Sequence, residues 1–192
     1  TMKQLGLVQF FSWFALFGMW VFTNDAVATH TYGLPVNDKS SDAYRTAGDW
    51  VGILFSVYNG VSAVYALTLP FIASKIGRKQ THAFSLICGG AGLISVYFIH
   101  DPNWLIVSMV LSMPYVILSA SIPAGKMGIY MGIFNFFITL PQLVNGIIGG
   151  PVVKYLYNNE PVYAIVIAGF FMLCAAISVM YVYDPGERNL KI

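Results

Sequence analysis

The sequence predicts an all-α membrane protein with six transmembrane helices. The chain has 192 residues, of which 57% are hydrophobic and 9% are charged, whereas a soluble domain has about 25% charged residues. Six apolar runs approach the length of about 20 residues that a helix needs to cross a bilayer. They cover residues 5–23, 50–73, 82–99, 104–122, 127–153 and 162–183. A membrane β-barrel would require segments of about ten alternating residues, and none of the six runs alternates.

Basic residues near the ends of the spans predict the orientation of the chain. If the amino terminus is cytoplasmic, seven Lys and Arg residues fall on the cytoplasmic side and three on the other. Short cytoplasmic loops are enriched in Lys and Arg. We therefore expect a multi-pass protein of the cell inner membrane with both termini in the cytoplasm and the lipid bilayer as its surroundings. A net charge of +2 is too small to indicate a nucleic acid partner.

Catalytic, metal and cofactor sites are not predicted. Cys88 and Cys174 fall in different apolar spans, where a thiol is usually a small buried hydrophobe. The sequence has no CxxC motif and no Cys/His cluster with metal-ligand spacing. No span carries a pair of His, Glu or Asp residues suited to acid–base chemistry, so an enzyme is the least expected class.

The first span, residues 5–23, has two indoles on one side. Helical spacing groups its polar and aromatic side chains with one leucine: Gln9, Ser12, Trp13, Leu16, Trp20 and Thr23. Trp20 lies close to the outer end and is expected to be an interfacial anchor. Trp13 lies near mid-membrane, where an indole either anchors the helix or stacks on a ligand. Both interpretations of Trp13 stay open.

Residues 24–49 form the predicted extracytoplasmic loop, which is the only extended polar segment. The loop is too polar to enter the membrane, and we expect His30 to be a solvated loop residue. Asp25 has two interpretations: a carboxylate at the mouth of a cavity, or an acidic residue at the end of a helix. No metal-ligand spacing is found in this segment.

The second span, residues 50–73, carries Asn59 at its middle, next to Tyr58. A primary amide is costly in hydrocarbon unless it meets a polar group or water. Asn59 is therefore a candidate for lining the path of a polar solute. The tight loop that follows has three cations within five residues, Lys75, Arg78 and Lys79, and we expect them to bind anionic lipid headgroups.

The third, fourth and sixth spans carry no predicted site. Glycines 89, 90 and 92 in the third span suit close approach of a neighbouring helix. The fourth span, residues 104–122, contains Pro114 and is barely long enough to cross a bilayer. The sixth span, residues 162–183, is apolar on every side, which predicts a lipid-facing support helix.

The fifth span, residues 127–153, combines bilayer-spanning length with a polar stripe. Spacings of three, four and seven residues place small and polar side chains on one side: Gly128, Gly132, Asn135, Thr139, Gln142, Gly146 and Gly149. We expect Asn135 and Gln142 to face a neighbouring helix or an aqueous cavity. One interpretation is helix packing through Gly128-xxx-Gly132 and Gly146-xxx-Gly150. The other is the wall of a polar-solute pathway.

Several motifs resemble known transporters. Gly77, Arg78 and Lys79 match the final G-R-K of the G-x-x-x-D-R-x-G-R-[KR] signature of the major facilitator superfamily, although the aspartate of the signature is absent. The stretches VQFFSWFALFGMWVF, GDWVGILFSVYNGVSA and MPYVILSASIPAGKMGIYMGIFNFFITLPQ are similar to bacterial sucrose-transporter-like sugar symporters, close to the glycoside-pentoside-hexuronide:cation symporters. The similarity covers nearly the whole chain. It identifies the chain with the carboxy-terminal six-helix half of a twelve-helix carrier.

The resemblance implies cation-coupled uptake of a sugar, a disaccharide such as maltose or sucrose, by alternating access. The residues expected to contact the sugar are Trp13, Tyr58, Asn59, Asn135 and Gln142, and Gly77, Arg78 and Lys79 would form the gating loop. No predicted span has a charge at its centre. The group that couples transport to the cation, H⁺ by resemblance, is therefore expected in a missing amino-terminal half.

Two further features shape these expectations. The chain begins Thr1–Met2, from which we expect a fragment or a truncated gene product. In the fourth span, the segment before Met113 to Tyr115 is shorter than the resemblance leads us to expect, which bears on whether this chain transports. The alternative function is a non-transporting six-helix membrane subunit or a degenerate carrier.

Overall fold

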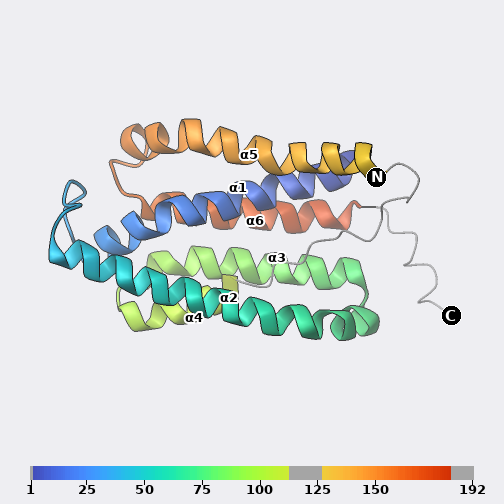
Figure 1. The fold of residues 1–192 in the computed structure, drawn as a ribbon, viewed down its shortest axis with the longest axis horizontal. Coiled ribbons are helices and arrows are strands. Elements are labelled where there is room, and N and C mark those ends of the chain that lie inside the picture. The colour runs from blue at the N-terminus through green and yellow to red at the C-terminus, as the bar shows by residue number, and fades with distance from the viewer. Residues whose placement is uncertain (1, 113–126, 183–192) are drawn as a thin grey trace.

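A computed structural model of the chain describes residues 2–112 and 127–182 (Figure 1). The helix α1, Met2–Ala26, continues into a π-helical turn at Val27–Thr31, and α2 covers Asp42–Ile76. The helix α3, Arg78–Ser95, ends in a 3₁₀ turn at Val96–Phe98, and a second 3₁₀ turn at Pro102–Trp104 leads into α4, Leu105–Ser112. The last two helices are α5, Met127–Tyr155, and α6, Val162–Met180.

The all-helical fold class is confirmed for the described residues. Five helices are long and apolar enough to span a membrane, and the apolar helix at residues 102–112 is shorter. The rest of the predicted fourth span, including Pro114, lies outside the described residues. The first loop is shorter than predicted: residues 24–31 continue α1 and its π turn, and residues 42–49 begin α2. Only residues 32–41 lie outside a helix in that segment.

The helices pack in an order that differs from their order in the chain. The helix α6 packs along α1 on one side and along α3 on the other. The helix α5 lies mainly against α1, and α2 lies mainly against α4 and α3. In Figure 1, α5 and α2 accordingly occupy opposite edges of the bundle, with α1, α6 and α3 between them.

The sixth span was predicted to be a lipid-facing support helix, and α6 does expose one apolar side, but it also packs between α1 and α3. Small residues on two adjoining rows of α6, among them Ala168, Gly169, Ala175 and Ala176, are buried against α1 and α3, whereas Phe170 is exposed. An apolar surface serves equally well against lipid and against another helix. The sequence of α6 therefore could not show which of its sides is buried.

Glycines allow the backbones of the middle helices to approach each other, as predicted for α3. A Cβ atom added at Gly90 would lie 2.8 Å from the carbonyl oxygen of Gly169 on α6. A Cβ atom at Gly92 would lie 2.5 Å from the backbone nitrogen of Ser112 and 2.7 Å from the carbonyl oxygen of Ser108 on α4. These contacts leave no room for a side chain, so both crossings depend on glycine.

The outer helices are much less buried than the middle ones. In their most apolar segments, 56% of α1, 56% of α3 and 44% of α6 are buried, against 17% for α2 and 17% for α5. The two helices that carry most of the predicted site residues are thus the two that the bundle covers least.

Candidate functional site

The indole of Trp13 is already engaged within α1. Its Nε1 donates a 2.8 Å hydrogen bond to Oε1 of Gln9 one turn earlier, and the ring of Trp20 packs edge-on at 6.1 Å. Gln9 is buried, Trp13 is half-buried and Trp20 is exposed. The shared face that helical spacing predicted is therefore divided between the bundle interior and its surface. A ligand at Trp13 would meet the ring rather than the indole N–H.

Tyr58 and Asn59 lie in different surroundings on α2. Tyr58 is buried, and its ring packs edge-on against Phe55 at 6.3 Å. Asn59 is exposed, and its Nδ2 donates a 2.8 Å hydrogen bond to the carbonyl of Phe55. A Cβ atom at the neighbouring Gly60 would meet nothing within 4 Å. The amide of Asn59 is thus placed midway along a long apolar helix, on its uncovered side.

The polar side chains in the α5 stripe lie at the surface of the bundle, whereas its glycines Gly146 and Gly149 lie next to Phe17 and Phe22 of α1. Asn135 and Thr139 are exposed and Gln142 is half-buried. Cβ atoms at Gly132 and Gly150 would meet nothing within 4 Å. The packing interpretation of the stripe thus finds no close helix contact at these two glycines, but a Cβ atom at Gly149 would lie 2.9 Å from the ring of Phe22 on α1.

The amide that α5 does bury is Asn145, which the sequence interpretation missed. Asn145 is 5% exposed, and its Nδ2 donates a 3.2 Å hydrogen bond to the carbonyl of Phe14 on α1. Two glycines make room for it: Cβ atoms at Gly18 and Gly149 would lie 3.0 Å from its Nδ2 and 2.8 Å from its Oδ1. Asn145 follows Gln142 by three residues and precedes Gly149 by four. Helical spacing could therefore have identified this row.

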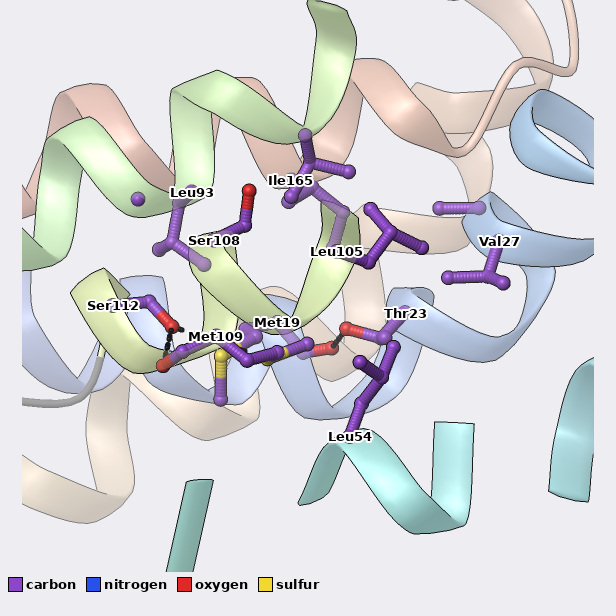
Figure 2. A pocket seen from close by; sticks show the side chains of 13 residues that line it. Met19, Thr23, Val27, Leu54, Leu93, Leu105, Ser108, Met109, Ser112 and Ile165 are labelled. Atoms are coloured by element: carbon purple, nitrogen blue, oxygen red, sulfur yellow. Dashed lines mark hydrogen bonds between the residues drawn. The ribbon is translucent and has the colours of Figure 1, made fainter. Parts of the chain in front are cut away.

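The centre of the bundle holds a small cavity (Figure 2). Its walls come from α1, α2, α3, α4 and α6, and its volume is about 10 Å³. Thr23 Oγ1 donates to the carbonyl of Met19, and Ser112 Oγ donates to the carbonyl of Met109, so two of its hydroxyls are satisfied by their own helices. This volume approaches that of a single water molecule. The cavity is too small for a sugar, and none of the five predicted sugar-contacting residues lines it.

A second cavity lies between α1, α5 and α6. Its volume is about 50 Å³, and Asn145 contributes to its wall together with aromatic and aliphatic side chains. None of the five predicted sugar-contacting residues lines this cavity either. The structure therefore does not bring Trp13, Tyr58, Asn59, Asn135 and Gln142 together in either of the two cavities.

Asp25 occupies a helix end rather than the mouth of either cavity. It lies in the last turn of α1, where its Oδ2 accepts a 2.8 Å hydrogen bond from Lys39 Nζ and its Oδ1 accepts one of 2.7 Å from the Tyr44 hydroxyl. Nδ2 of Asn24 donates to the same hydroxyl at 2.7 Å. The hydrogen bond with Asp25 holds the pKa of Lys39 above its usual value. This network ties the first loop and the start of α2 to the end of α1.

His30 is not the solvated loop residue that the sequence predicted. It lies in the π turn after α1, and its Nε2 is 2.9 Å from the carbonyl oxygen of Tyr97. Its ring stacks on Tyr97 and lies 4.6 Å from the ring of His100. A carbonyl oxygen only accepts hydrogen bonds, so Nε2 carries the proton. Within residues 2–112 and 127–182, no group of three or more His, Cys, Asp or Glu could hold a metal ion.

The loop between α2 and α3 consists of Gly77 alone. Its N–H donates to the carbonyl of Ala73, and its own carbonyl accepts from the backbone N–H and the hydroxyl of Thr81. Gly77 has φ of +91° and ψ of 147°, a conformation that only glycine adopts readily. Arg78 and Lys79 form the first turn of α3, with Arg78 exposed and Lys79 half-buried. The gating role implied for these three residues stays a prediction.

No family model, no curated protein and no solved structure matches the chain. The candidate functional site therefore rests on residues that the sequence predicted and whose exposure the structure gives. It consists of exposed Asn59 on α2, exposed Asn135 and half-buried Gln142 on α5, and the indole ring of Trp13 on α1. The helices α2 and α5 lie at opposite edges of the bundle, so the bundle alone does not bring these amides together. We call Asn59, Asn135 and Gln142 the outer amides.

Proposed function

We propose that the chain is one half of a cation-coupled sugar carrier and that its outer amides line the sugar pathway together with a second six-helix unit. The observation that carries this proposal is the exposure of Asn59 and Asn135 on the two least buried helices. In lipid, these positions would place amides against hydrocarbon. In a carrier, the same positions face water and substrate.

The free energy of desolvation favours the carrier arrangement. Moving a primary amide from water into hydrocarbon without a hydrogen-bond partner costs about 4–8 kcal/mol. Asn59 recovers part of this cost through its hydrogen bond to the carbonyl of Phe55. A polar neighbour outside the described bundle would recover more. An aqueous pathway or a partner unit supplies such neighbours, and lipid chains do not.

The chemistry of the outer amides suits a sugar. Each amide group both donates and accepts hydrogen bonds, as a sugar hydroxyl does. The ring of Trp13 supplies a flat apolar surface of the kind that stacks on a sugar face. The bond from Trp13 Nε1 to Gln9 fixes the orientation of the indole. Tyr58, which is buried in this bundle, would act by supporting the helix next to Asn59.

Cation coupling is assigned to the partner unit. The only membrane-end carboxylate of α1, Asp25, is bound by Lys39 and Tyr44. Coupling to an ion usually uses an ionisable group inside the membrane. Within the described spans, the acidic residues lie at helix ends rather than at helix centres. The coupling carboxylate therefore belongs to the other half of the carrier.

Substitution of Asn135 by Ala tests the proposal. In proteoliposomes that hold the carrier containing this chain, Asn135→Ala should lower uptake of labelled maltose or sucrose several-fold, because one hydrogen bond contributes about 1 kcal/mol. The amount of protein in the membrane should not change. Ile147→Ala is the matched control, because Ile147 is an exposed apolar residue of the same helix, and it should leave uptake unchanged.

Two outcomes would contradict the proposal. If Asn135→Ala lowers the amount of protein in the membrane in parallel with uptake, the residue has a packing role. If the unsubstituted protein supports no uptake of any sugar across a panel, with or without a proton gradient, the chain is a non-transporting subunit.

A further inference from the structure

Two histidines that are far apart in the sequence meet at one end of the bundle. His30 lies in the π-helical turn after α1, and His100 lies in the link between α3 and α4. Figure 1 shows the end of α1 and this link at the same end of the bundle. The centres of the two imidazole rings are 4.6 Å apart, and their planes are inclined by 41°. This inclination lies between the parallel and edge-on arrangements that aromatic pairs prefer.

The imidazole of His30 is held in the way that metal-binding histidines usually are. Its Nε2–H donates a 2.9 Å hydrogen bond to the carbonyl of Tyr97, and its ring stacks on the ring of Tyr97 at 5.6 Å. A metal-bound histidine almost always donates its second ring N–H to a carbonyl, a carboxylate or water, which fixes the tautomer and the orientation of the ring. In the neutral ring of His30, Nδ1 therefore keeps a lone pair for a ligand.

The imidazole of His100 is available at the surface of the protein. The residue is exposed, and its ring nitrogens make no hydrogen bond with the described residues. Its ring contact with His30 is the interaction that places it. Because an exposed side chain can rotate about its χ angles, either ring nitrogen of His100 can turn toward an ion that His30 also binds.

Hydrogen bonds fix the backbone around both histidines. In the π turn that carries His30, the N–H of Tyr32 donates to the carbonyl of Val27. In the turn after His100, the carbonyl of Pro102 accepts a 2.9 Å hydrogen bond from Nε1 of Trp50 on α2. An ion would therefore meet two ligands whose segments are already ordered, and less conformational entropy is lost on binding.

The spacing of the rings agrees with one shared ion. Metal–nitrogen bonds of about 2.0–2.1 Å put the centres of two imidazoles about 4.5–5.2 Å apart when the nitrogen–metal–nitrogen angle is roughly 90–110°. The observed 4.6 Å corresponds to the lower end of that range of angles. Right angles are typical of tetragonal Cu²⁺ and Ni²⁺ sites rather than tetrahedral zinc sites, and Cu²⁺ binds most tightly among the divalent first-row ions.

We propose that His30 and His100 form a binding site for a divalent transition-metal ion, with Cu²⁺ as the preferred ion. Nδ1 of His30 and one ring nitrogen of His100 are the protein ligands. Within residues 2–112 and 127–182, no third His, Cys, Asp or Glu joins them, so water completes the coordination. The ion ties the end of α1 to the link between α3 and α4. This site is separate from the outer amides and does not depend on the function proposed above.

Electron paramagnetic resonance tests the site. One equivalent of Cu²⁺ is added to the full chain, purified in detergent micelles without a histidine tag. We expect one bound ion per chain, with a spectrum that shows coupling to two imidazole nitrogens. His30→Gln and His100→Gln should each remove one nitrogen from this coupling. Each should weaken binding by at least about 10- to 100-fold, which is the cost of losing even an outer-shell partner of a metal ligand.

Asp42→Asn is the matched control. Asp42 is an exposed carboxylate in the first turn of α2, at the same end of the bundle (Figure 1), and its substitution should leave the spectrum and the affinity unchanged. His100→Gln changes an exposed side chain, so the test stays decisive even if His30→Gln does not fold. An unchanged spectrum in His100→Gln, or coupling to fewer than two nitrogens in the unsubstituted chain, would overturn the proposal.

Thermal unfolding supplies a second measurement. A ligand that binds only the folded state stabilises it. Cu²⁺ should therefore raise the midpoint of unfolding of the unsubstituted chain and of Asp42→Asn, but not that of His100→Gln. An equal rise in all three proteins would mean that the ion binds elsewhere and would contradict the proposal.

Discussion

The middle helices α1 and α3 are about as apolar as the outer helices α2 and α5, and the middle helix α6 is more apolar, but the two groups differ chiefly in their surroundings. The middle helices bury about half of their apolar segments, and the outer helices bury 17%. Glycine contacts with α6 and α4 hold α3 in place, whereas Gly60 of α2 and Gly132 of α5 meet open space. Length and apolar composition show that a helix could cross a membrane, but they do not show what that helix touches.

Polar side chains also have different surroundings in the middle helices and in the outer helices. In the middle of the bundle, Ser95 and Ser108 bond to each other across α3 and α4 at 2.6 Å, and Thr23 bonds to its own helix. On the outer helices, Asn59 and Asn135 are exposed. Buried hydroxyls stabilise this bundle, while the exposed amides are available to something outside it.

The largest expected effect comes from substituting a glycine of the middle helices. Gly92→Val would force its Cβ atom against the backbone of Ser108 and Ser112, so α3 and α4 would have to separate. We expect a loss of about 3 kcal/mol or more in the free energy of unfolding, measured by denaturation in mixed detergent micelles with circular dichroism.

The matched control for that prediction is Gly60→Ala on α2. It should stabilise the protein by about 0.5–1 kcal/mol, because alanine favours the helix and its methyl group meets open space. A destabilised Gly60→Ala variant would contradict the comparison, since it would show that α2 is packed as tightly as the middle helices.

An intermediate effect on the free energy of unfolding is expected when a leucine of a middle helix is truncated, in comparison with a leucine of an outer helix. Leu93 of α3 is 1% exposed and lines the central cavity, whereas Leu67 of α2 is 84% exposed. Leu93→Ala should cost about 2–4 kcal/mol, because it enlarges a cavity that cannot collapse freely. Leu67→Ala should change the free energy of unfolding by less than about 0.5 kcal/mol. Similar losses for both variants in the same assay would remove the distinction between the two regions.

The smallest effect is expected at the ion pair that attaches the first loop. Lys39 and Asp25 pair at 2.8 Å, with their side chains 60% and 31% exposed. Lys39→Met should therefore cost no more than about 1 kcal/mol, and the difference should shrink in high salt. Because the pKa of Lys39 is raised in the folded protein, its contribution is present below the unfolded pKa and is lost as the pH rises through the folded value.

Arg45→Met is the control for the loop variant. The Arg45–Asp42 pair is longer, at 3.4 Å, and is almost fully exposed. It should show no measurable change in thermal stability in the same salt series. A loss at Arg45 equal to that at Lys39 would mean that the Asp25 network has no special role.

Length and apolar composition were enough to predict the five long helices, and glycine content predicted the close crossings of α3. The second half of the predicted fourth span lies outside the described residues. Helix boundaries near residues 24–31 and 42–49 were missed because a polar residue at a membrane surface is compatible with either helix or loop. The buried side of α6 and the contact face of α5 were missed for another reason. Lipid and protein interior are both apolar, so periodicity carries little information about which side is covered.

Some residues of the candidate site could be predicted from the sequence, and others could not. Asn59 and Asn135 could be selected from sequence because an amide in an apolar span is costly wherever it points. Asn145 has the same chemistry and lies in the same span, so it could have been selected too, but only the structure shows that it is the amide that meets α1. The contact of His30 with Tyr97 and His100 joins segments about 70 residues apart in the chain. No short sequence pattern predicts such a contact.

The one-residue turn at Gly77 explains how α2 can remain attached while burying so little of its surface. A helix on a long flexible linker would have to secure its position through contacts alone. Here Gly77 joins the end of α2 directly to α3, and Lys39 and Tyr44 hold its other end to Asp25. Such short tethers give α2 a high effective concentration next to its neighbours. Lengthening this turn with a few glycines would expose how weak the lateral contacts of α2 are.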